Sequence, residues 1–323
     1  MKKTVWLLVD NRQGSAGQIR GIAQQLSPQH YTIIEHQLAY NALSALPNWL
    51  RGSSLLGVSA PSLLEHQGDY PDIILSGSRR SAPVARWIKK HSHGRSKIVQ
   101  LLYPGMFGHK DFDLIVIPEH DRGKISGDNV RFVTGSPHRI TPASLSAART
   151  QWQDSFAALP RPLTAVIIGG KIKGKGFSAA DALAFGQAIK HFHQARGGSL
   201  LITDSRRTGT EGEQIILQQL LSIPTYTYLI GDNKPNPYMG YLACADYILV
   251  SGDSVSMCCE ACGTGKPVYI FSGRDWLTPK HHRFVDSLLQ GGYAASLEAM
   301  PLDFQPRSTL NPAAEIASAI SKL

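Results

Sequence analysis

Residues 247–271 read YILVSGDSVSMCCEACGTGKPVYIF, and the alternation within them indicates the fold class. Tyr247–Val250 is a short, apolar run that is typical of a buried strand. Hydroxyl-bearing residues then begin a helix over Ser256–Gly263, and Gly263–Pro267 ends that helix before a second strand at Val268–Phe271. Strand, helix and strand in this order predict a parallel α/β layer.

The same alternation continues outward through the whole chain. In the first half, apolar runs predict strands at Val5–Val9, Thr32–His36, Ile73–Ser76, Ile98–Leu102, Leu114–Ile117 and Arg131–Thr134. In the second half they predict strands at Leu163–Ile168, Ser199–Thr203, Thr227–Leu229, Tyr247–Val250 and Val268–Phe271. Helical patterns fit between the strands at Gly17–Leu26, Ala82–Lys90, Ala179–Ala195, Glu211–Leu221 and Ser256–Gly263. The expected fold is therefore α/β, with two parallel sheets.

Two domains suit a chain of 323 residues. The boundary is expected near Ala157–Pro162, where the helical pattern stops just before a new strand, so residues 1–158 and 159–305 form the two domains. A final helix within 306–323 starts after Asn311, with proline at its first position. Each half opens with a strand and a glycine-bearing turn, which carries Gly14 and Gly17 in the first half and Gly169 and Gly170 in the second.

The charge balance favours an anionic partner. The 33 Lys and Arg outnumber the 24 Asp and Glu, which gives a net charge of +9. Such a protein attracts nucleotide phosphates, nucleic acid or an anionic membrane surface. The basic residues are dispersed and are not interleaved with aromatic residues, which argues against a nucleic-acid groove.

The cysteines and the N-terminus bear on the cellular location. Three of the four cysteines lie within five residues on one predicted helix, which fits no disulfide framework and favours buried thiols in a reducing compartment. The apolar run Thr4–Val9 is too short for a signal peptide and meets Asp10 at once. A cytoplasmic protein is the expectation.

Residues 41–64 break the pattern, because many apolar residues, among them Trp49 and Leu50, stand there with few charges. A helix that covers the edge of the sheet is the favoured interpretation. The alternative is a surface that dips into a membrane or holds a lipid-like acceptor.

The chemistry of the opening stretch comes from the start of its helix. The N–H groups of a first helical turn and the positive end of the helix dipole suit a diphosphate, and Ser254 and Ser256 add hydroxyls. Glu260 lies four residues after Ser256, on the same face of the helix, where a carboxylate can accept hydrogen bonds from a ribose diol. The simpler interpretation is that Ser254 caps the helix and Glu260 is surface charge.

These residues carry a resemblance to a known family. Asp253–Ser256, followed by Glu260 and Ala261 and by Gly263–Val268, resembles the ELM1 family of glycosyltransferases, which is named after a plant mitochondrial-fission protein. The stretch is similar, more distantly, to the donor helix of the transferase that makes lipid II. Further family-like segments follow in order over about residues 5–270, at Ser78–Ala85, Pro118–Asp121, Thr203–Thr208 and Asn236–Tyr238.

The resemblance implies a GT-B fold, with two Rossmann-like domains that face each other across a cleft. It places the acceptor on the N-terminal domain and the donor nucleotide on the C-terminal domain, and it implies that the last helix crosses back to the first domain. It implies no metal and no cofactor, since the nucleotide-sugar is a co-substrate and the helix dipole and basic side chains balance its diphosphate. The residues expected at the nucleotide are Gly169, Gly170, Lys173, Ser205, Arg206, Asn236, Asp253, Ser254, Val255, Ser256 and Glu260.

The general base is the one catalytic group that the resemblance does not identify. Members of the family often carry histidine after the glycine of the first turn, where this chain has Ser15. Four residues near strand ends remain as candidates, namely Asp10, Glu119, His120 and Asp121. If none of them serves, the chain binds its ligand without turnover.

Basic pairs follow one strand in each half. Arg206 and Arg207 suit phosphate, because a guanidinium matches phosphate oxygens, although ion pairing within the protein explains them equally well. Arg79 and Arg80 open a helix and are expected to meet an anionic acceptor, such as a phosphorylated sugar or lipid, or else to be a solvated helix start.

Three other functions compete with the transferase. The spacing of Gly169, Gly174 and Lys175 resembles a phosphate-binding loop, but Gly176 stands where a hydroxyl should hold Mg²⁺. A nicotinamide-binding turn would need a third glycine beside Gly14 and Gly17. A non-catalytic scaffold at a membrane is the third alternative.

The sequence therefore predicts a metal-independent glycosyltransferase. Its donor is a nucleotide-sugar, and its acceptor is a saccharide of the cell envelope, such as a lipopolysaccharide precursor, or one linked to a lipid. We expect it in the cytoplasm, in peripheral contact with the anionic inner membrane, and without a nucleic-acid partner.

Overall fold

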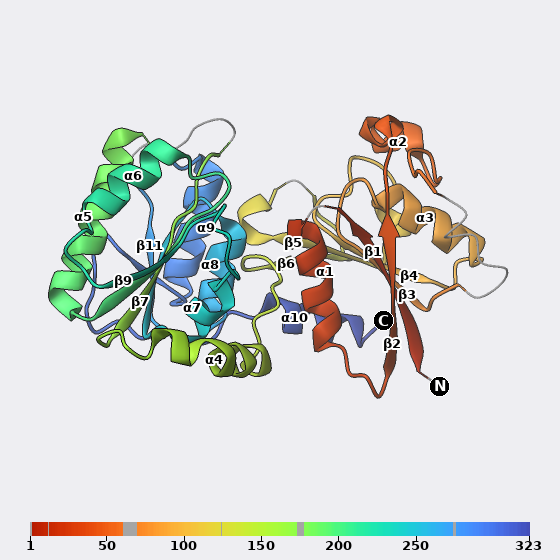
Figure 1. The fold of residues 1–323 in the computed structure, drawn as a ribbon. Coiled ribbons are helices and arrows are strands. Elements are labelled where there is room, and N and C mark those ends of the chain that lie inside the picture. Colours follow the sequence, from red (N-terminus) through yellow and green to blue (C-terminus); the bar gives the residue numbers. More distant parts are fainter. Residues whose placement is uncertain (1, 12, 61–69, 124, 173–177, 274–275) are drawn as a thin grey trace. The chain divides into compact units, whose positions relative to one another are not determined.

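The computed structural model describes residues 2–11, 13–60, 70–123, 125–172, 178–273 and 276–323. The chain divides into two compact units, of which unit 1 comprises Met1–Arg139 and Asn311–Leu323 and unit 2 comprises Ile140–Leu310 (Figure 1). Each unit is built on a six-stranded parallel sheet, so the predicted α/β class is confirmed.

The sheet of unit 1 has the strand order β2-β1-β3-β4-β5-β6. Its strands are β1 (Lys3–Asp10), β2 (Tyr31–Leu38), β3 (Ile73–Ser76), β4 (Lys97–Leu101), β5 (Leu114–Pro118) and β6 (Val130–Val133). Its helices are α1 (Gln13–Gln25), α2 (Asn48–Arg51), α3 (Ala82–His91) and α10 (Pro312–Ile320), with short 3₁₀ turns at η1 (Ala42–Ala45), η3 (His109–Asp111) and η4 (Glu119–Asp121).

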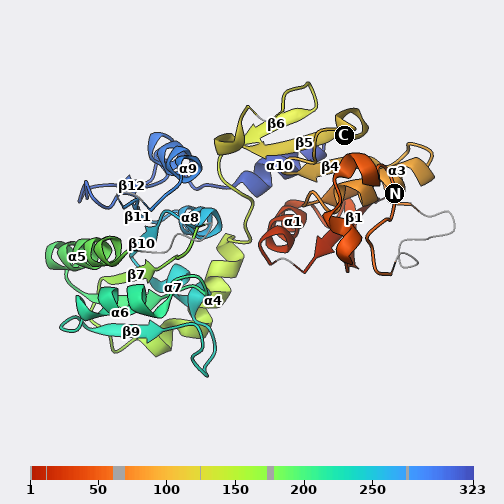
Figure 2. The ribbon, with the colours of Figure 1, turned by 90° about the horizontal axis from the view of Figure 1, so that it is seen from above.

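Strand β1 supplies both cores of unit 1, because successive side chains of a strand point to opposite faces of the sheet. Val5 packs in the core on one face and Trp6 in the core on the other. On the Val5 side, Ile316 of α10 packs with Ile19 of α1, and the two helices lie side by side in both views of the ribbon (Figures 1 and 2). The last helix therefore belongs to the core of unit 1.

The sheet of unit 2 has the order β12-β11-β10-β7-β8-β9. Its strands are β7 (Leu163–Ile167), β8 (Ser199–Thr203), β9 (Thr225–Tyr228), β10 (Tyr247–Ser251), β11 (Val268–Phe271) and β12 (Ala295–Ser296). Its helices are α4 (Pro142–Phe156), α5 (Ala179–Arg196), α6 (Thr210–Gln218), α7 (Tyr238–Cys244), α8 (Val255–Cys262) and α9 (Pro279–Gln290).

Aromatic residues hold the helices of unit 2 to its sheet. Phe185 of α5 stacks on Phe271 of β11 with ring centroids 4.6 Å apart, and Phe192, two turns further on, meets Tyr269 edge to face. Helix α4 lies against α7, where a Cβ at Gly240 would collide with the ring of Trp152. The four cysteines are free thiols buried in this core.

The division of the chain lies earlier than the boundary expected at residues 157–162. Helix α4 belongs to unit 2, because Ala148 and Phe156 pack in its core and Arg149 donates a hydrogen bond to the carbonyl of Ala243. The return to unit 1 comes at Asn311 instead of residue 306.

Two local expectations are wrong. Helix α1 begins at Gln13, so Gly14 and Gly17 lie inside the helix and form no glycine turn after β1. The segment after Asn41 contains no long helix over the sheet edge within its described part, residues 41–60. It consists of η1 and the single turn α2, which packs on the loops that follow β3 and β4.

Candidate functional site

The strand order of unit 2 places its candidate site. The chain leaves β7 toward β8 and β9 and then returns to the other side of β7 as β10, so the direction of winding reverses between β7 and β10. In open α/β sheets, ligands bind outside the carboxyl ends of the strands at such a switch point. The residues that follow these two strands include Gly169, Gly170 and Asp253–Ser256.

Asp253 ties the two strand ends together. The N–H of Gly169 donates to Ser251 Oγ at 2.7 Å, Ser251 Oγ donates to Asp253 Oδ1 at 2.8 Å, and the N–H of Gly170 donates to Asp253 Oδ2 at 2.7 Å. A Cβ at Gly169 would collide with the Asp253 carboxylate, and one at Gly170 with the backbone of Arg207. The glycines, expected at the ligand, thus use their N–H groups inside the protein and are needed for close packing.

Asp253 itself is buried and structural. Burial raises the pKa of its carboxyl, while hydrogen bonds from Gly170 and Ser251 and the charge of Arg207 act in the opposite direction. The Arg207 guanidinium lies 3.4 Å from Asp253 Oδ2. Asp253 was expected to bind the nucleotide, and the structure engages both of its carboxylate oxygens within the protein.

The loop after β8 folds against the same glycine turn. Ser205 accepts a hydrogen bond from the N–H of Arg207, and Thr208 Oγ1 donates to the carbonyl of Gly169. Arg207 Nη1 donates to the carbonyl of Lys171 at 3.0 Å. Arg206 differs from these neighbours, because it is exposed and makes no hydrogen bond or ion pair with the described residues. Of the two arginines, Arg206 is therefore the one whose charge can meet a ligand.

Helix α8 starts at this switch point. Ser254 is its N-cap residue, as the simpler interpretation expected, but its side chain makes no capping hydrogen bond. The N–H groups of Val255 and Ser256 have no acceptor among the described residues, and both side chains are half-buried. The first turn thus offers N–H groups together with the half-buried Ser256 hydroxyl, next to Ser254, which is only 9% exposed.

Glu260 lies one turn deeper and is not surface charge. Tyr238 donates its hydroxyl to Glu260 Oε2 at 2.6 Å, which fixes the carboxylate. Burial and the carboxylate of Glu260 raise the pKa of Tyr238 well above its ordinary value, so the phenol stays protonated and donates. Asn236 is exposed and accepts from the N–H of Tyr238 at 2.9 Å, so it positions the start of α7.

Tyr238 is the site residue that the sequence missed as an individual. It formed part of the motif Asn236–Tyr238, but nothing in the sequence connected it with Glu260, 22 residues further on. Lys173, together with Gly174, Lys175 and Gly176 of the loop that resembles a phosphate-binding motif, lies outside the described residues.

Unit 1 has a polar site of its own at the carboxyl ends of β1 and β3, which is the switch point of its sheet. Asp10 is buried, accepts a hydrogen bond from Ser15 Oγ at 2.8 Å and pairs with Arg80 Nη2 at 2.9 Å. The guanidinium of Arg80 also lies over the ring of Tyr40, 4.6 Å from its centroid. Burial and the charge of Asp10 raise the pKa of Tyr40 above its ordinary range.

The other three candidates for the base stand on η4, after β5. Two strands, β3 and β4, separate β1 from β5, which places the two strand ends about 14 Å apart. Glu119 accepts two hydrogen bonds from Arg122, which hold the pKa of its carboxyl below the usual value. His120 is buried and Asp121 is half-buried. The structure therefore does not bring Asp10 together with the residues of η4.

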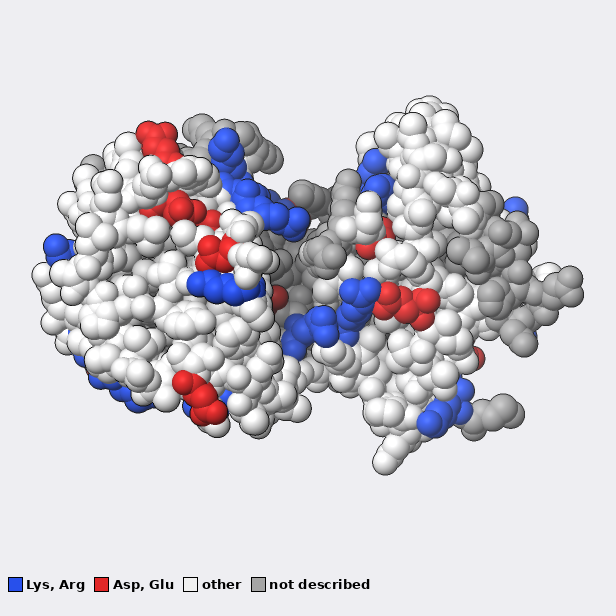
Figure 3. Space-filling model, in the orientation of Figure 1, with Lys and Arg blue, Asp and Glu red and all other residues white. Residues whose placement is uncertain are grey.

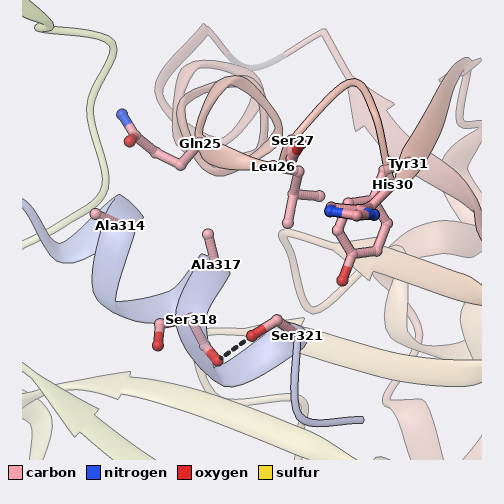
Figure 4. Close-up of a pocket in the computed structure, with 9 residues that line it drawn as sticks. All are labelled: Gln25, Leu26, Ser27, His30, Tyr31, Ala314, Ala317, Ser318 and Ser321. Carbon is pink, nitrogen blue, oxygen red and sulfur yellow. Dashed lines mark hydrogen bonds between the residues drawn. The ribbon is translucent and has the colours of Figure 1, made fainter.

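A pocket of about 540 Å³ lies elsewhere in unit 1, between the end of α1, the start of β2 and α10 (Figure 4). Its lining includes Ser27, His30 and Tyr31 beside Ala317 and Ser318. Because β2 begins at Tyr31, the pocket lies at the amino ends of the parallel strands, opposite to Asp10.

The described residues contain no group of three or more His, Cys, Asp or Glu side chains placed to share a metal ion. Within the same part of the chain, no helix combines the length and the apolar character that crossing a membrane requires.

Comparison with known proteins gives the family. Residues 13–323 match the family described as Mitochondrial fission ELM1. Uncharacterized protein RP120 of Rickettsia prowazekii (strain Madrid E) is 30% identical over 319 residues, which cover 88% of this chain and 88% of that protein. Mitochondrial fission protein ELM1 of Arabidopsis thaliana is 32% identical over 252 residues, which cover 72% of this chain but only 58% of that protein.

Solved structures show the fold. The UDP-GlcNAc 2-epimerase from Methanocaldococcus jannaschii has a TM-score of 0.60 at 11% identity and covers 99% of this chain and 100% of its own. The enzyme of that name from Neisseria meningitidis, bound to UDP-GlcNAc, has a TM-score of 0.56 at 16% identity with the same coverage. MurG of Acinetobacter baumannii has a TM-score of 0.53 at 12% identity, again with 99% and 100% covered. The fold is of the GT-B type.

Proposed function

The chain belongs to the mitochondrial fission ELM1 family, and from that premise we propose that it is a glycosyltransferase whose donor nucleotide-sugar binds unit 2 at the first turn of α8. The observation that carries the proposal is the arrangement at the switch point between β7 and β10. There the start of α8, which has no side-chain capping hydrogen bond, meets the loop after β8 through Arg207 and Asp253. That loop also carries the exposed Arg206, and Glu260 lies one turn deeper on α8. The Neisseria meningitidis protein of the same fold is described as bound to UDP-GlcNAc.

The diphosphate and the ribose of the nucleotide each have a matching group. The N–H groups of Val255 and Ser256 and the hydroxyls of Ser254 and Ser256 receive the diphosphate, and the positive end of the α8 dipole favours its charge. Arg206 adds a guanidinium that no described residue neutralises. Glu260, held by Tyr238, accepts from the ribose diol.

Unit 1 supplies the acceptor side of the proposal. Arg79 is exposed and Arg80 is partly exposed at the carboxyl end of β3, where they suit an acceptor that carries phosphate. A saccharide of the cell envelope, joined to a lipid through phosphate, has this chemistry.

Binding experiments on the whole chain test the donor site. Thermal shift with UDP, GDP, TDP and CMP should find at least one nucleotide that raises the melting temperature, since a ligand of the folded state stabilises it. We expect Glu260→Ala and Arg206→Ala each to weaken that nucleotide by about 1–3 kcal/mol, which is roughly 5- to 150-fold in Kd by calorimetry.

Two exposed residues of unit 2 provide matched controls. Glu211→Ala removes a carboxylate from α6 and Lys190→Ala removes a cation from α5, and neither should change the affinity. If no nucleotide binds, or if Glu260→Ala binds as tightly as the parent chain, the donor site is not where we place it.

A second function, nucleotide binding without turnover, is favoured by one observation. Both carboxylate oxygens of Asp10 accept hydrogen bonds within the protein, and so do both oxygens of Glu119, so neither is a ready base. Nucleotide release from UDP-sugars, measured with a membrane extract as acceptor source, separates the two functions. A transferase releases nucleotide only when acceptor is present, whereas a binding protein releases none.

A further inference from the structure

Unit 1 exposes a group of large apolar side chains around α2. We call it the α2 surface, and its members are Leu43, Trp49, Leu50, Leu56, Met106 and Phe107. Trp49 is 60% exposed and Met106 is 76% exposed, fractions that are unusual for such side chains. A contiguous apolar surface on a folded protein marks a binding site for a protein, a membrane or a ligand.

Two segments that are distant in sequence build this surface together. Asn48 Nδ2 donates to the carbonyl of Pro104, and the backbone of Gly105 lies against the Asn48 side chain. These contacts hold the backbone just before Trp49 against the backbone just before Met106. The exposed apolar side chains of the two segments therefore start from neighbouring stretches of the chain.

The turn α2 has an inner and an outer face. Asn48 donates to the carbonyl of Arg79, and Arg51, only 1% exposed, donates to the carbonyls of Leu56 and Arg80. The polar side chains of the turn thus point inward and anchor it. Its apolar side chains, Trp49 and Leu50, point outward, which is the reverse of what a protein core would produce.

The charge around this surface is mainly positive, and the carboxylate of Asp111, which follows the second segment, is paired with Arg86. Neither segment that builds it, residues 41–58 or 103–110, contains an aspartate or a glutamate. The guanidinium of Arg79 lies at the carbonyls of Ala45 and Leu46, and Lys110 is exposed at the end of the second segment. In the space-filling view the surface over α2 is mostly white, with blue at its border (Figure 3).

We propose that the α2 surface docks on an anionic lipid bilayer. Exposed Trp, Leu, Phe and Met side chains enter the boundary between headgroups and acyl chains, and the bordering cations meet the lipid phosphates. Because the inner face of α2 packs on the Arg79–Arg80 turn, docking there brings the polar site of unit 1 close to the lipid surface. The nucleotide site of unit 2 plays no part in this binding.

Vesicle sedimentation of the whole chain, without nucleotide, tests the proposal. We expect binding to vesicles of phosphatidylcholine mixed with phosphatidylglycerol, weaker binding to phosphatidylcholine alone, and a decrease with salt. The double variant Trp49→Ser with Phe107→Ser should partition into the mixed vesicles at least about tenfold more weakly, since two large apolar side chains no longer leave water. Leu221→Ser is the matched control, because Leu221 is 84% exposed on unit 2 and should not change binding.

Tryptophan fluorescence gives a second readout that does not depend on a disruptive variant. Of the five tryptophans Trp49 alone is exposed, so brominated lipids should quench the parent chain. Trp49→Phe should keep the binding and lose most of the quenching. The proposal fails if the parent chain ignores both kinds of vesicle, if the double variant binds like the parent, or if Leu221→Ser weakens binding as much. It also fails if the double variant instead dissociates an oligomer in solution, which would make a second copy the occupant.

Discussion

At the scale of single residues, Asp253 belongs to the expected nucleotide-binding motif and also connects two neighbouring strands of the sheet. Its two carboxylate oxygens take hydrogen bonds from the end of β7 and from Ser251 of β10, the strand beside it. These hydrogen bonds join the ends of β7 and β10 at the switch point without any ligand. The first turn of α8 follows directly in the chain, so its position is set by this connection.

Asp253→Asn should lower the free energy of unfolding by about 1–3 kcal/mol, measured by urea denaturation. The amide of asparagine presents one oxygen and one nitrogen, and that nitrogen cannot accept the hydrogen bond that Asp253 now takes there from the N–H of Gly170 or the hydroxyl of Ser251. Asp286→Asn, on the exposed side of α9, is the control and should leave the stability unchanged. Equal stability of the two variants would show that the connection carries little energy.

Ser15 offers a second prediction at this scale. Its hydroxyl lies 2.8 Å from Asp10 Oδ1, so a histidine in its place would stand beside a carboxylate that can orient and charge-balance the imidazole. We expect Ser15→His to raise the rate of nucleotide release from the donor by about a hundredfold, as a well-placed base does. An unchanged rate would mean that position 15 does not face the acceptor.

At the scale of elements, strands were far easier to predict than turns. Strands such as β3, β8 and β11 are buried on both faces, so they appear in the sequence as unbroken apolar runs and their bounds were predicted without error. Strand β12 has two residues, too few for any pattern. The turn α2 inverts the usual rule, because it exposes its apolar residues, and periodicity could not predict it.

The candidate site also has a part that the sequence could predict and a part that it could not. Residues that share one element, such as Ser254, Ser256 and Glu260, could be grouped from helical spacing alone. The contacts of Glu260 with Tyr238 and of Asp253 with Gly170 join elements that are 22 and 83 residues apart, and only the strand order brings these together. The engaged oxygens of Asp10 were equally hidden, since Arg80 follows it by 70 residues.

Lys266, which follows α8, caps the end of helix α7 and should make the stability of the protein depend on pH. Its ammonium donates to the carbonyls of Leu242, Ala243 and Ala245 at the end of that helix, and burial lowers its pKa from 10.5 to about 8. Between these two values the unfolded chain keeps a proton that the folded chain has released. The free energy of unfolding should therefore rise with pH from about 8 to 10.5 through this residue.

The variant Lys266→Met isolates that effect. Urea denaturation of both chains at several pH values across the window should show the parent gaining stability relative to the variant as the pH rises. Below about pH 8 the difference should be constant. Parallel curves over the whole window would contradict a lowered pKa for Lys266.

At the scale of the whole molecule, unit 2 is an insertion in unit 1. The chain leaves unit 1 at Arg139 and comes back at Asn311, and α10 then completes the core around α1. Each unit has its own sheet, its own hydrophobic packing on that sheet and its own switch point. A ligand that binds at one switch point should consequently slow amide exchange in one unit only.

Hydrogen–deuterium exchange on the whole chain can display that effect. With the nucleotide found by thermal shift, amides should gain protection in three places of unit 2, namely the glycine turn after β7, the Asp204–Gly209 loop after β8 and the first turn of α8. These segments meet at one sheet edge, so one ligand can order all three. The amides of β1 to β6 should exchange as before, and Glu260→Ala should lose most of the protection at an equal nucleotide concentration. Protection that instead centred on Asp10 and the loop after β3 would move the nucleotide to unit 1 and make α8 a purely structural helix.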